Sequence, residues 1–293
     1  MLFLIFMIIP IVINSAYIFI MLFACAHIFH IGYNVWQIYL FGLSLICTLS
    51  YCGYFNLFNP LIILTSKYQE IDTKEFNTIS SYLTKVLHTH NNIYPDNQII
   101  DINDIKIYKT YSPIFKIFTV GQNNLIINDI LMKSVTDKQI DGMCAILCGE
   151  MFLNGGRFRN ILTINIFLHD IVINTIKFIK NSILQNFKIT HASLMSFKTL
   201  WMIPILILLI SFTPVLLFLW VLDKIMQLSV IFFDKNIMLN VDKYVLSLGK
   251  KDELIEFLEL LKLHESTTQN TAPLLRFWLN QYSPTARINL LIS

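Results

Sequence analysis

One glutamate in an apolar helix has the clearest chemical potential in this sequence. Glu150 lies in the stretch CAILCGEMFLNGG, residues 144–156. In a zinc-binding helix of the His-Glu-x-x-His type, two histidines four residues apart hold one metal, and the glutamate between them polarises a metal-bound water. Here the two histidine positions are Gly149 and Leu153. The segment therefore keeps the general base of a zinc site without these two ligands.

Two cysteines near Glu150 offer sulfur ligands, but the helix directs them elsewhere. Cys144 and Cys148 are four residues apart. At about 100° per residue they lie roughly 120 to 160° around the helix from the face shared by positions 149 and 153. We therefore expect both thiols in the core, and all five cysteines reduced. His88, His90, His191 and His264 have no partner at ligand spacing, and His169 lies too far down the following segment to reach the site. We therefore interpret these five side chains as solvated or hydrogen-bonded.

The composition indicates a membrane protein. Of 293 residues, 55% are hydrophobic and 14% are charged, which is far from the average of soluble proteins. A net charge of +3 is too small to indicate a nucleic-acid surface. Residues 1–23 have no basic residue and stay apolar for too long to be a signal peptide, so they are predicted to be an uncleaved membrane span.

The apolar segments predict about four transmembrane helices. Residues 2–23 and 35–55 would form a first hairpin. Residues 161–180 are apolar but contain His169, Asp170 and Asn174, so they are either a polar-lined span or an interfacial helix. Residues 200–222 carry Trp201 and Trp220 near their ends, about 28 Å apart along a helix, as expected for a span between two interfaces.

The remaining segments predict a mainly helical domain with a small antiparallel sheet, and thus an α+β fold. An amphipathic helix begins behind a Thr73 cap, and residues 101–131 have the short Ile-, Tyr- and Phe-rich runs of strands. A capping box, Thr136 with Gln139, starts the helix that carries Glu150. A second charged amphipathic helix covers residues 250–264.

In this order the parts resemble the HtpX family of integral membrane zinc metallopeptidases. That family has an Asn-Ala-Phe-x-x-Gly strand before the zinc helix, and KIFTVG, residues 116–121, keeps its phenylalanine and glycine. The segment LIINDILM, residues 125–132, is similar to the strand that follows, and VTDKQIDGMCAIL, residues 135–147, to the start of the zinc helix. The C-terminal SPTARINLL matches the family's tail at Arg287 and Ile288.

The resemblance also places the family's third zinc ligand, a glutamate, at Met238. The surrounding segment MLNVDKYVLSLGKKDELIEFLELL keeps the aspartate and glycine of the family's pattern as Asp242 and Gly249. Zinc is expected for the family, but glycine, leucine and methionine at the three ligand positions cannot supply a zinc site, so no bound zinc is expected here. Of the chemical set, Glu150 and Asp242 remain as relics of the general base and of a supporting residue.

The resemblance implies a division into two membrane hairpins and a zincin-like domain in two parts. Residues 1–57 and 160–222 are the expected hairpins, and residues 58–159 and 223–293 the two parts of the domain. Both parts lie on one side of the membrane only if two spans separate them. Basic residues concentrate in these parts, which favours a cytoplasmic domain, and the resemblance implies that the membrane is a bacterial inner membrane.

Three functions remain open from the sequence. The first is a catalytically inactive pseudopeptidase in the lipid bilayer, which binds membrane-protein clients or joins a membrane assembly, with no nucleic-acid partner. In that case Glu150 stays ionised or pairs with a base such as Arg157, and Asp242 caps or pairs locally. The second is an active membrane metalloendopeptidase with non-standard ligands. The third is a four-span transport or secretion component unrelated to peptidases.

Overall fold

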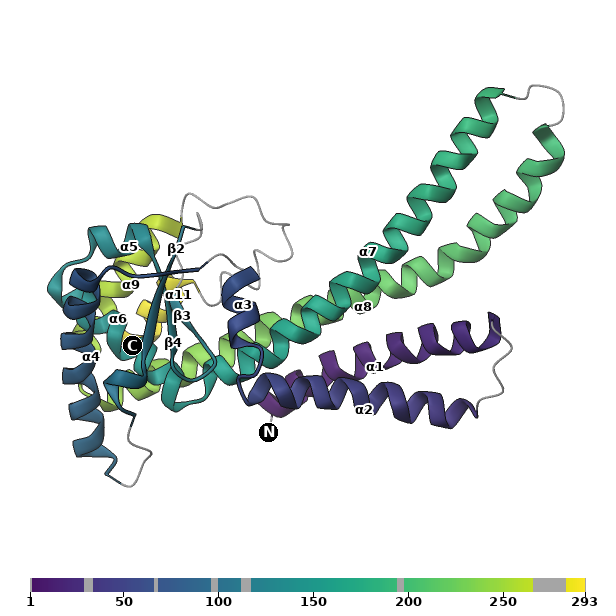
Figure 1. Ribbon diagram of the computed structural model, residues 1–293. Helices are drawn as coiled ribbons and strands as arrows, with labels where there is room; N and C mark the ends of the chain where they lie inside the picture. Colours follow the sequence, from purple (N-terminus) through teal and green to yellow (C-terminus); the bar gives the residue numbers. More distant parts are fainter. Residues whose placement is uncertain are drawn as a thin grey trace. The chain divides into compact units, whose positions relative to one another are not determined.

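The protein is described by a computed structural model, in which helices predominate and accompany one small sheet (Figure 1). This arrangement confirms the predicted α+β class. The structure describes residues 2–28, 34–65, 68–95, 100–111, 117–193, 198–265 and 283–292. The chain divides into two compact units, one of residues 1–50 with 162–230 and one of residues 51–161 with 231–293.

The first unit is built from apolar helices. It contains α1 (Leu2–Ile28), most of α2 (Val35–Tyr54) and the adjoining parts of α7 (Gly155–Ser193) and α8 (Lys198–Ser247). No charged residue precedes Lys67, so α1 and α2 carry no charged side chain and are mostly apolar. Both helices were predicted from this pattern. α8 continues to Ser247, so the mixed segment expected after residue 223 begins as part of the same helix.

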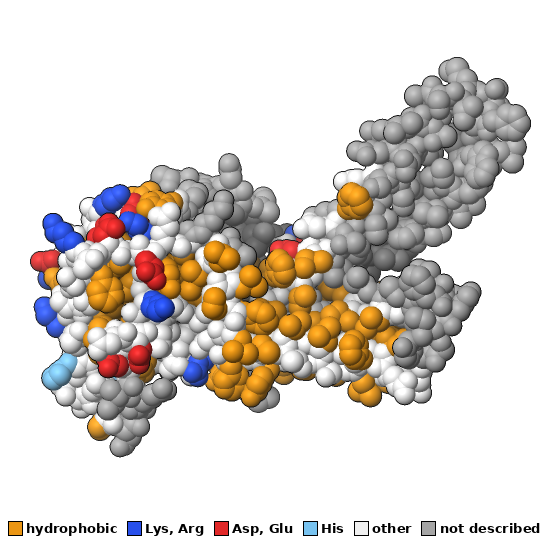
Figure 2. All heavy atoms as spheres, in the orientation of Figure 1, with side chains coloured by type: hydrophobic (Ala, Val, Ile, Leu, Met, Phe, Trp, Pro, Cys, Tyr) orange, Lys and Arg blue, Asp and Glu red, His pale blue; other side chains and the backbone are white. Residues whose placement is uncertain are grey.

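Large apolar side chains are exposed along α1 and α2, and Figure 2 shows them gathered over this part of the chain. Among the described residues, one helical stretch, Trp36–Tyr54, is long and apolar enough to cross a membrane, and the apolar stretch Ile8–Ile20 is shorter. The segments 161–180 and 200–222 are helical, in α7 and α8, but many of their side chains lie outside the described set. The exposed apolar residues of α1 and α2 include Ile8, Val12, Ile20, Trp36, Leu40 and Phe41.

The second unit is centred on α6 (Asp137–Phe152), which packs against α4 (Thr73–Ile93), α9 (Lys251–Glu265) and the sheet. Every residue of α6 from Gly142 to Met151 is buried. The close approach of α9 requires Gly142, because a Cβ there would lie 2.2 Å from the backbone oxygen of Glu253. The short helices are α3 (Asn59–Thr65), η1 (Ile102–Asp104), α5 (Asp129–Ser134) and α11 (Pro284–Ile292).

The sequence signals near the starts of α4 and α6 predicted where these two helices begin, with one small error. The capping box at Thr136 and Gln139 is present, and the amphipathic pattern of α4 buries Ile79 and Leu83 as expected. The cap of α4, however, is Asp72 rather than Thr73. Asp72 has an extended backbone, whereas Thr73 already belongs to the helix.

The sheet is mixed, so the prediction of a purely antiparallel sheet was wrong. Its order is β1 (Gln69–Glu70), β2 (Lys106–Thr110), β4 (Asn124–Asn128) and β3 (Ile117–Val120). β3 and β4 form an antiparallel hairpin, and β1 is antiparallel to β2. β4 runs parallel to β2, because the chain forms β3 at the far edge first and returns into the place beside β2. β3 is therefore an edge strand.

Candidate functional site

Glu150, on α6, is fully buried and hydrogen-bonded to the edge strand β3 and to the start of α7. Its Oε2 accepts from the backbone N–H of Thr119 at 2.7 Å and from the Thr119 hydroxyl at 3.1 Å. The guanidinium of Arg159 donates through one nitrogen to Oε2 at 2.9 Å and through the other to Oε1 at 3.0 Å. Arg159 also donates to the Thr119 carbonyl oxygen at 3.1 Å. The Glu150–Arg159 pair thus binds both backbone groups of Thr119.

A sharp turn between α6 and α7 brings Arg159 back to Glu150. α6 is capped by Leu153, and Asn154 has a φ of 56°, in the left-handed region. The two glycines that follow, Gly155 and Gly156, start α7. A Cβ on Gly156 would lie 1.9 Å from the backbone oxygen of Gly121 and 2.5 Å from the Thr119 hydroxyl. Only glycine allows α7 to begin this close to the β3–β4 hairpin.

The predicted partner Arg157 was wrong, since Glu150 pairs with Arg159. The expectation placed positions 150 and 157 on one continuous helix face, but the turn at residues 153 and 154 separates the two helices. Arg157 instead donates to Gln122 and to Asn154 Oδ1, and its guanidinium lies over the Tyr54 ring.

This environment removes the features that a general base needs. Four hydrogen bonds from Thr119 and Arg159 engage both oxygens of the carboxylate, three at Oε2 and one at Oε1. Burial alone lowers the pKa of the Arg159 guanidinium, but the charge of Glu150 and the hydrogen bonds between them raise it well above its ordinary value. The result is a charged, two-point pair inside the protein, and a carboxylate that is buried and bonded to Arg159 through both oxygens is poorly placed to take a proton from a substrate or water.

The position of the first predicted ligand, Gly149, is closed by α8. A Cβ on Gly149 would lie 2.9 Å from Tyr244 Cδ1 and 3.1 Å from Val241 Cγ1. Tyr244 belongs to an aromatic cluster with His90 and Phe152. The His90 ring stacks on Phe152 with 3.6 Å between the centroids, and its Nδ1 is 2.8 Å from the Tyr244 hydroxyl. The cluster of His90, Phe152 and Tyr244 fills the space beside α6 at Gly149.

The other two positions at which the resemblance places a zinc ligand, Leu153 and Met238, point to no metal chemistry. Leu153 caps α6 and is 38% exposed, and Met238 is half-buried on α8. An aliphatic side chain, a thioether and a glycine closed off by Tyr244 do not fit a zinc ion. Among the described residues, no group of three or more His, Cys, Asp or Glu side chains could hold a metal.

Asp242 was expected to cap or pair locally. It instead forms hydrogen bonds with a residue far along the chain. Arg287 on α11 donates from Nε to Asp242 Oδ2 at 2.8 Å and from a terminal nitrogen to Oδ1. Both side chains are buried. Each of the two predicted relics therefore has its own arginine partner, Arg159 for Glu150 and Arg287 for Asp242.

The two cysteines of α6 are buried in the core, as their helical positions predicted. Burial raises the pKa of the Cys148 thiol to about 12 and raises that of Cys144 as well. A thiol that stays protonated is neither a nucleophile nor a metal ligand. The bonds that define this site were missed for two reasons. Those of Thr119 and Tyr244 join elements distant in sequence, and that of Arg159, nine residues from Glu150, depends on the turn between α6 and α7. In the sequence, the local signals for these bonds were limited to Phe118 and Thr119 in a predicted strand and to Arg159 shortly after two glycines.

No known family model matches the chain, and no curated protein matches it.

The burial of His90 predicts that the protein is less stable to unfolding at acidic pH. Burial lowers the pKa of His90 below its ordinary 6.5, so between these two values the unfolded chain binds more protons than the folded one. The contribution of His90 to the free energy of unfolding is therefore fully present above pH 6.5 and is lost progressively as the pH drops below it. We expect a His90→Gln variant to lose part of this acid sensitivity in thermal unfolding scans from pH 7.5 to 5. His88→Gln, at an exposed position on the same helix, is the matched control and should keep the wild-type slope.

Proposed function

We propose that this chain is an HtpX-like pseudopeptidase, a membrane-embedded protein that has lost peptidase chemistry and binds membrane-protein clients. The observation that carries the proposal is the Glu150–Arg159 pair. The one acidic residue that remains from a zinc helix is buried, and its oxygens are taken by Arg159 and Thr119. Such a carboxylate stabilises the fold and does not act as a base.

Two further features support the family part of the proposal. A helix, a sheet and the Glu150 helix follow one another between the N-terminal helix pair and α7, as the resemblance requires. The aspartate of the third motif and the arginine of the C-terminal motif, Asp242 and Arg287, form a buried ion pair. Two motifs quoted independently from the sequence thus meet in space, which a chance resemblance has no reason to produce.

The membrane part of the proposal rests on α1 and α2. No charge interrupts the first 66 residues, and Trp36–Tyr54 has the length and hydropathy of a span. Apolar residues exposed at Leu40 and Phe41 would be costly in water over so long a surface. The four-span arrangement, with 161–180 and 200–222 as the third and fourth spans and a cytoplasmic domain in a bacterial inner membrane, belongs to the same proposal.

The metal content of detergent-purified protein, measured by elemental mass spectrometry, separates the two peptidase-related functions. We expect far less than one zinc per chain, and no cleavage of a membrane-protein substrate before or after zinc is added. One zinc per chain with chelator-sensitive cleavage would establish the metallopeptidase with non-standard ligands instead.

Client binding is tested with a photo-crosslinking residue at Phe41, exposed on α2. The paired variant Glu150→Gln with Arg159→Gln removes the carboxylate together with its counter-charge. We expect it to crosslink the same membrane proteins as the wild type, with the same residue at exposed Thr84 on α4 as the background control. If crosslinking depends on the Glu150 carboxylate, the pseudopeptidase function is wrong. If it yields fixed subunits of one transport complex, the third function replaces it.

A further inference from the structure

The interior of the first unit holds a row of buried polar side chains among apolar helices. Asn14 on α1 donates from Nδ2 to the backbone oxygen of Asn165 on α7 at 2.8 Å and to its Oδ1 at 2.9 Å. Asn165 in turn donates from Nδ2 to the Ser50 hydroxyl of α2 at 3.1 Å. These three residues connect three helices through their side chains.

A second polar group lies one helical turn further along the same two helices. His169, four residues after Asn165, has its Nε2 3.0 Å from Asp223 Oδ1 on α8. Tyr17, three residues after Asn14, stacks on the His169 ring with 5.5 Å between centroids. Residues three or four apart lie above one another on a helix, so the two groups are neighbours.

Three polar atoms of these groups have no hydrogen-bond partner among the described residues. They are Asn14 Oδ1, the Tyr17 hydroxyl and His169 Nδ1. The residues themselves are 1–2% exposed, so bulk water does not reach them. An unpaired buried polar atom costs its full desolvation free energy, and three on one pair of facing helices require a common explanation.

The hydrogen-bonding roles of the three atoms can be assigned from their chemistry. In the tautomer with its single hydrogen on Nε2, His169 donates that hydrogen to Asp223 and presents Nδ1 as an acceptor. Asn14 Oδ1 is also an acceptor, while the Tyr17 hydroxyl can donate. A bound molecule that donates two hydrogen bonds and accepts one would therefore satisfy all three atoms.

We propose that Asn14, Tyr17 and His169 enclose a binding site for one water molecule. Water donates to Asn14 Oδ1 and His169 Nδ1 and accepts from the Tyr17 hydroxyl, which satisfies all three atoms. An ammonium ion would have no acceptor for the tyrosine hydrogen. With water bound, one hydrogen-bonded chain runs from Asp223 through His169, Asn14 and Asn165 to Ser50. It fixes the register of α8, α7, α1 and α2.

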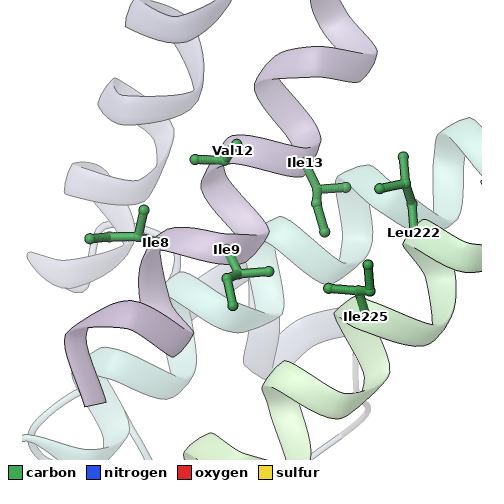
Figure 3. Close-up of a pocket in the computed structure, with 6 residues that line it drawn as sticks. All are labelled: Ile8, Ile9, Val12, Ile13, Leu222 and Ile225. Atoms are coloured by element: carbon green, nitrogen blue, oxygen red, sulfur yellow. The ribbon is translucent and has the colours of Figure 1, made fainter. Parts of the chain in front are cut away.

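The surroundings favour a neutral guest. Tyr17 packs with Ile13 and Met226 in one apolar cluster. Beyond this cluster α1 and α8 border a groove of about 300 Å³, and Figure 3 shows that every side chain drawn along it is aliphatic: Ile8, Ile9, Val12, Ile13, Leu222 and Ile225. This side of the site supplies neither a counter-ion nor a competing hydrogen-bond partner.

Tyr17→Phe in the full chain in detergent micelles tests the site. If water is bound, the variant breaks one of its three bonds, and we expect the melting temperature to fall by several degrees. If no guest is bound, the variant removes an unpaired buried hydroxyl and the melting temperature rises or stays the same. Tyr51→Phe, at a 63% exposed tyrosine, is the control and should not change it.

A direct measurement accompanies the stability test. In protein with ¹⁵N-labelled histidine, we expect a nuclear Overhauser contact between the His169 ring and a long-lived water, and its loss in Tyr17→Phe. The proposal is overturned if Tyr17→Phe does not lower the melting temperature, or if the wild-type ring shows no such contact.

Discussion

Glu150→Gln is expected to destabilise the protein by about 3–5 kcal/mol, the range seen when one partner of a buried ion pair is removed. Arg159 would keep its charge beside Thr119 but lose the carboxylate that neutralises it. The glutamine amide would also present hydrogens to the Arg159 or Thr119 donors. Guanidinium unfolding of the full chain in micelles, followed by circular dichroism, measures the change.

Two variants show whether this loss arises from the buried charge. Glu256→Gln breaks an ion pair with Lys138 that lies at the surface, and we expect little change. The paired variant Glu150→Gln with Arg159→Gln should recover much of the stability, because neither side chain is then charged. A Glu150→Gln variant as stable as wild type would mean that the carboxylate is not paired in solution, and the case against a catalytic base would fail.

Gly156→Ala is expected to cost at least about 3 kcal/mol, beyond the usual range of about 1–3 kcal/mol for overpacking. The added methyl would lie 1.9 Å from the backbone oxygen of Gly121, which no side-chain rotation can relieve. Either the β3–β4 hairpin or the start of α7 must shift. A shift of α7 would also displace Arg159 from Glu150, so the hydrogen-exchange protection of the Thr119 amide should fall in the same variant.

Gly155→Ala is the matched control at the adjacent position. The nearest atoms to its added methyl are 3.2 and 3.3 Å away, a tight contact that small movements relieve. We expect a far smaller loss of stability and a protected Thr119 amide. Equal losses in the two variants would contradict the close approach of α7 to the hairpin.

The sequence predicted those parts of the fold that depend on neighbouring residues. Helical periodicity located α4, and the capping box at Thr136 located the start of α6. The angular position of Cys144 and Cys148 on that helix was enough to place both thiols in the core. Each of these features is set within a few residues, where spacing and side-chain type act directly.

The site could not be predicted in the same way, because its contacts join distant segments. Arg159 reaches Glu150 only because Asn154 turns the chain, and Arg287 reaches Asp242 across 45 residues. The prediction of a purely antiparallel sheet failed for a related reason. Four short strands are compatible with several orders, and the parallel pairing of β2 with β4 follows from packing that no single strand encodes.

The bonds at Thr119 also determine how a bound polypeptide can be recognised. An extended peptide that joins a sheet does so through the unpaired backbone groups of an edge strand, largely regardless of its sequence. At β3 those groups of Thr119 already bond Glu150 and Arg159. A peptide therefore cannot pair with Thr119 as an added strand while these bonds hold. If the protein binds clients as proposed, a client at this point of the sheet is recognised through its side chains rather than through its backbone.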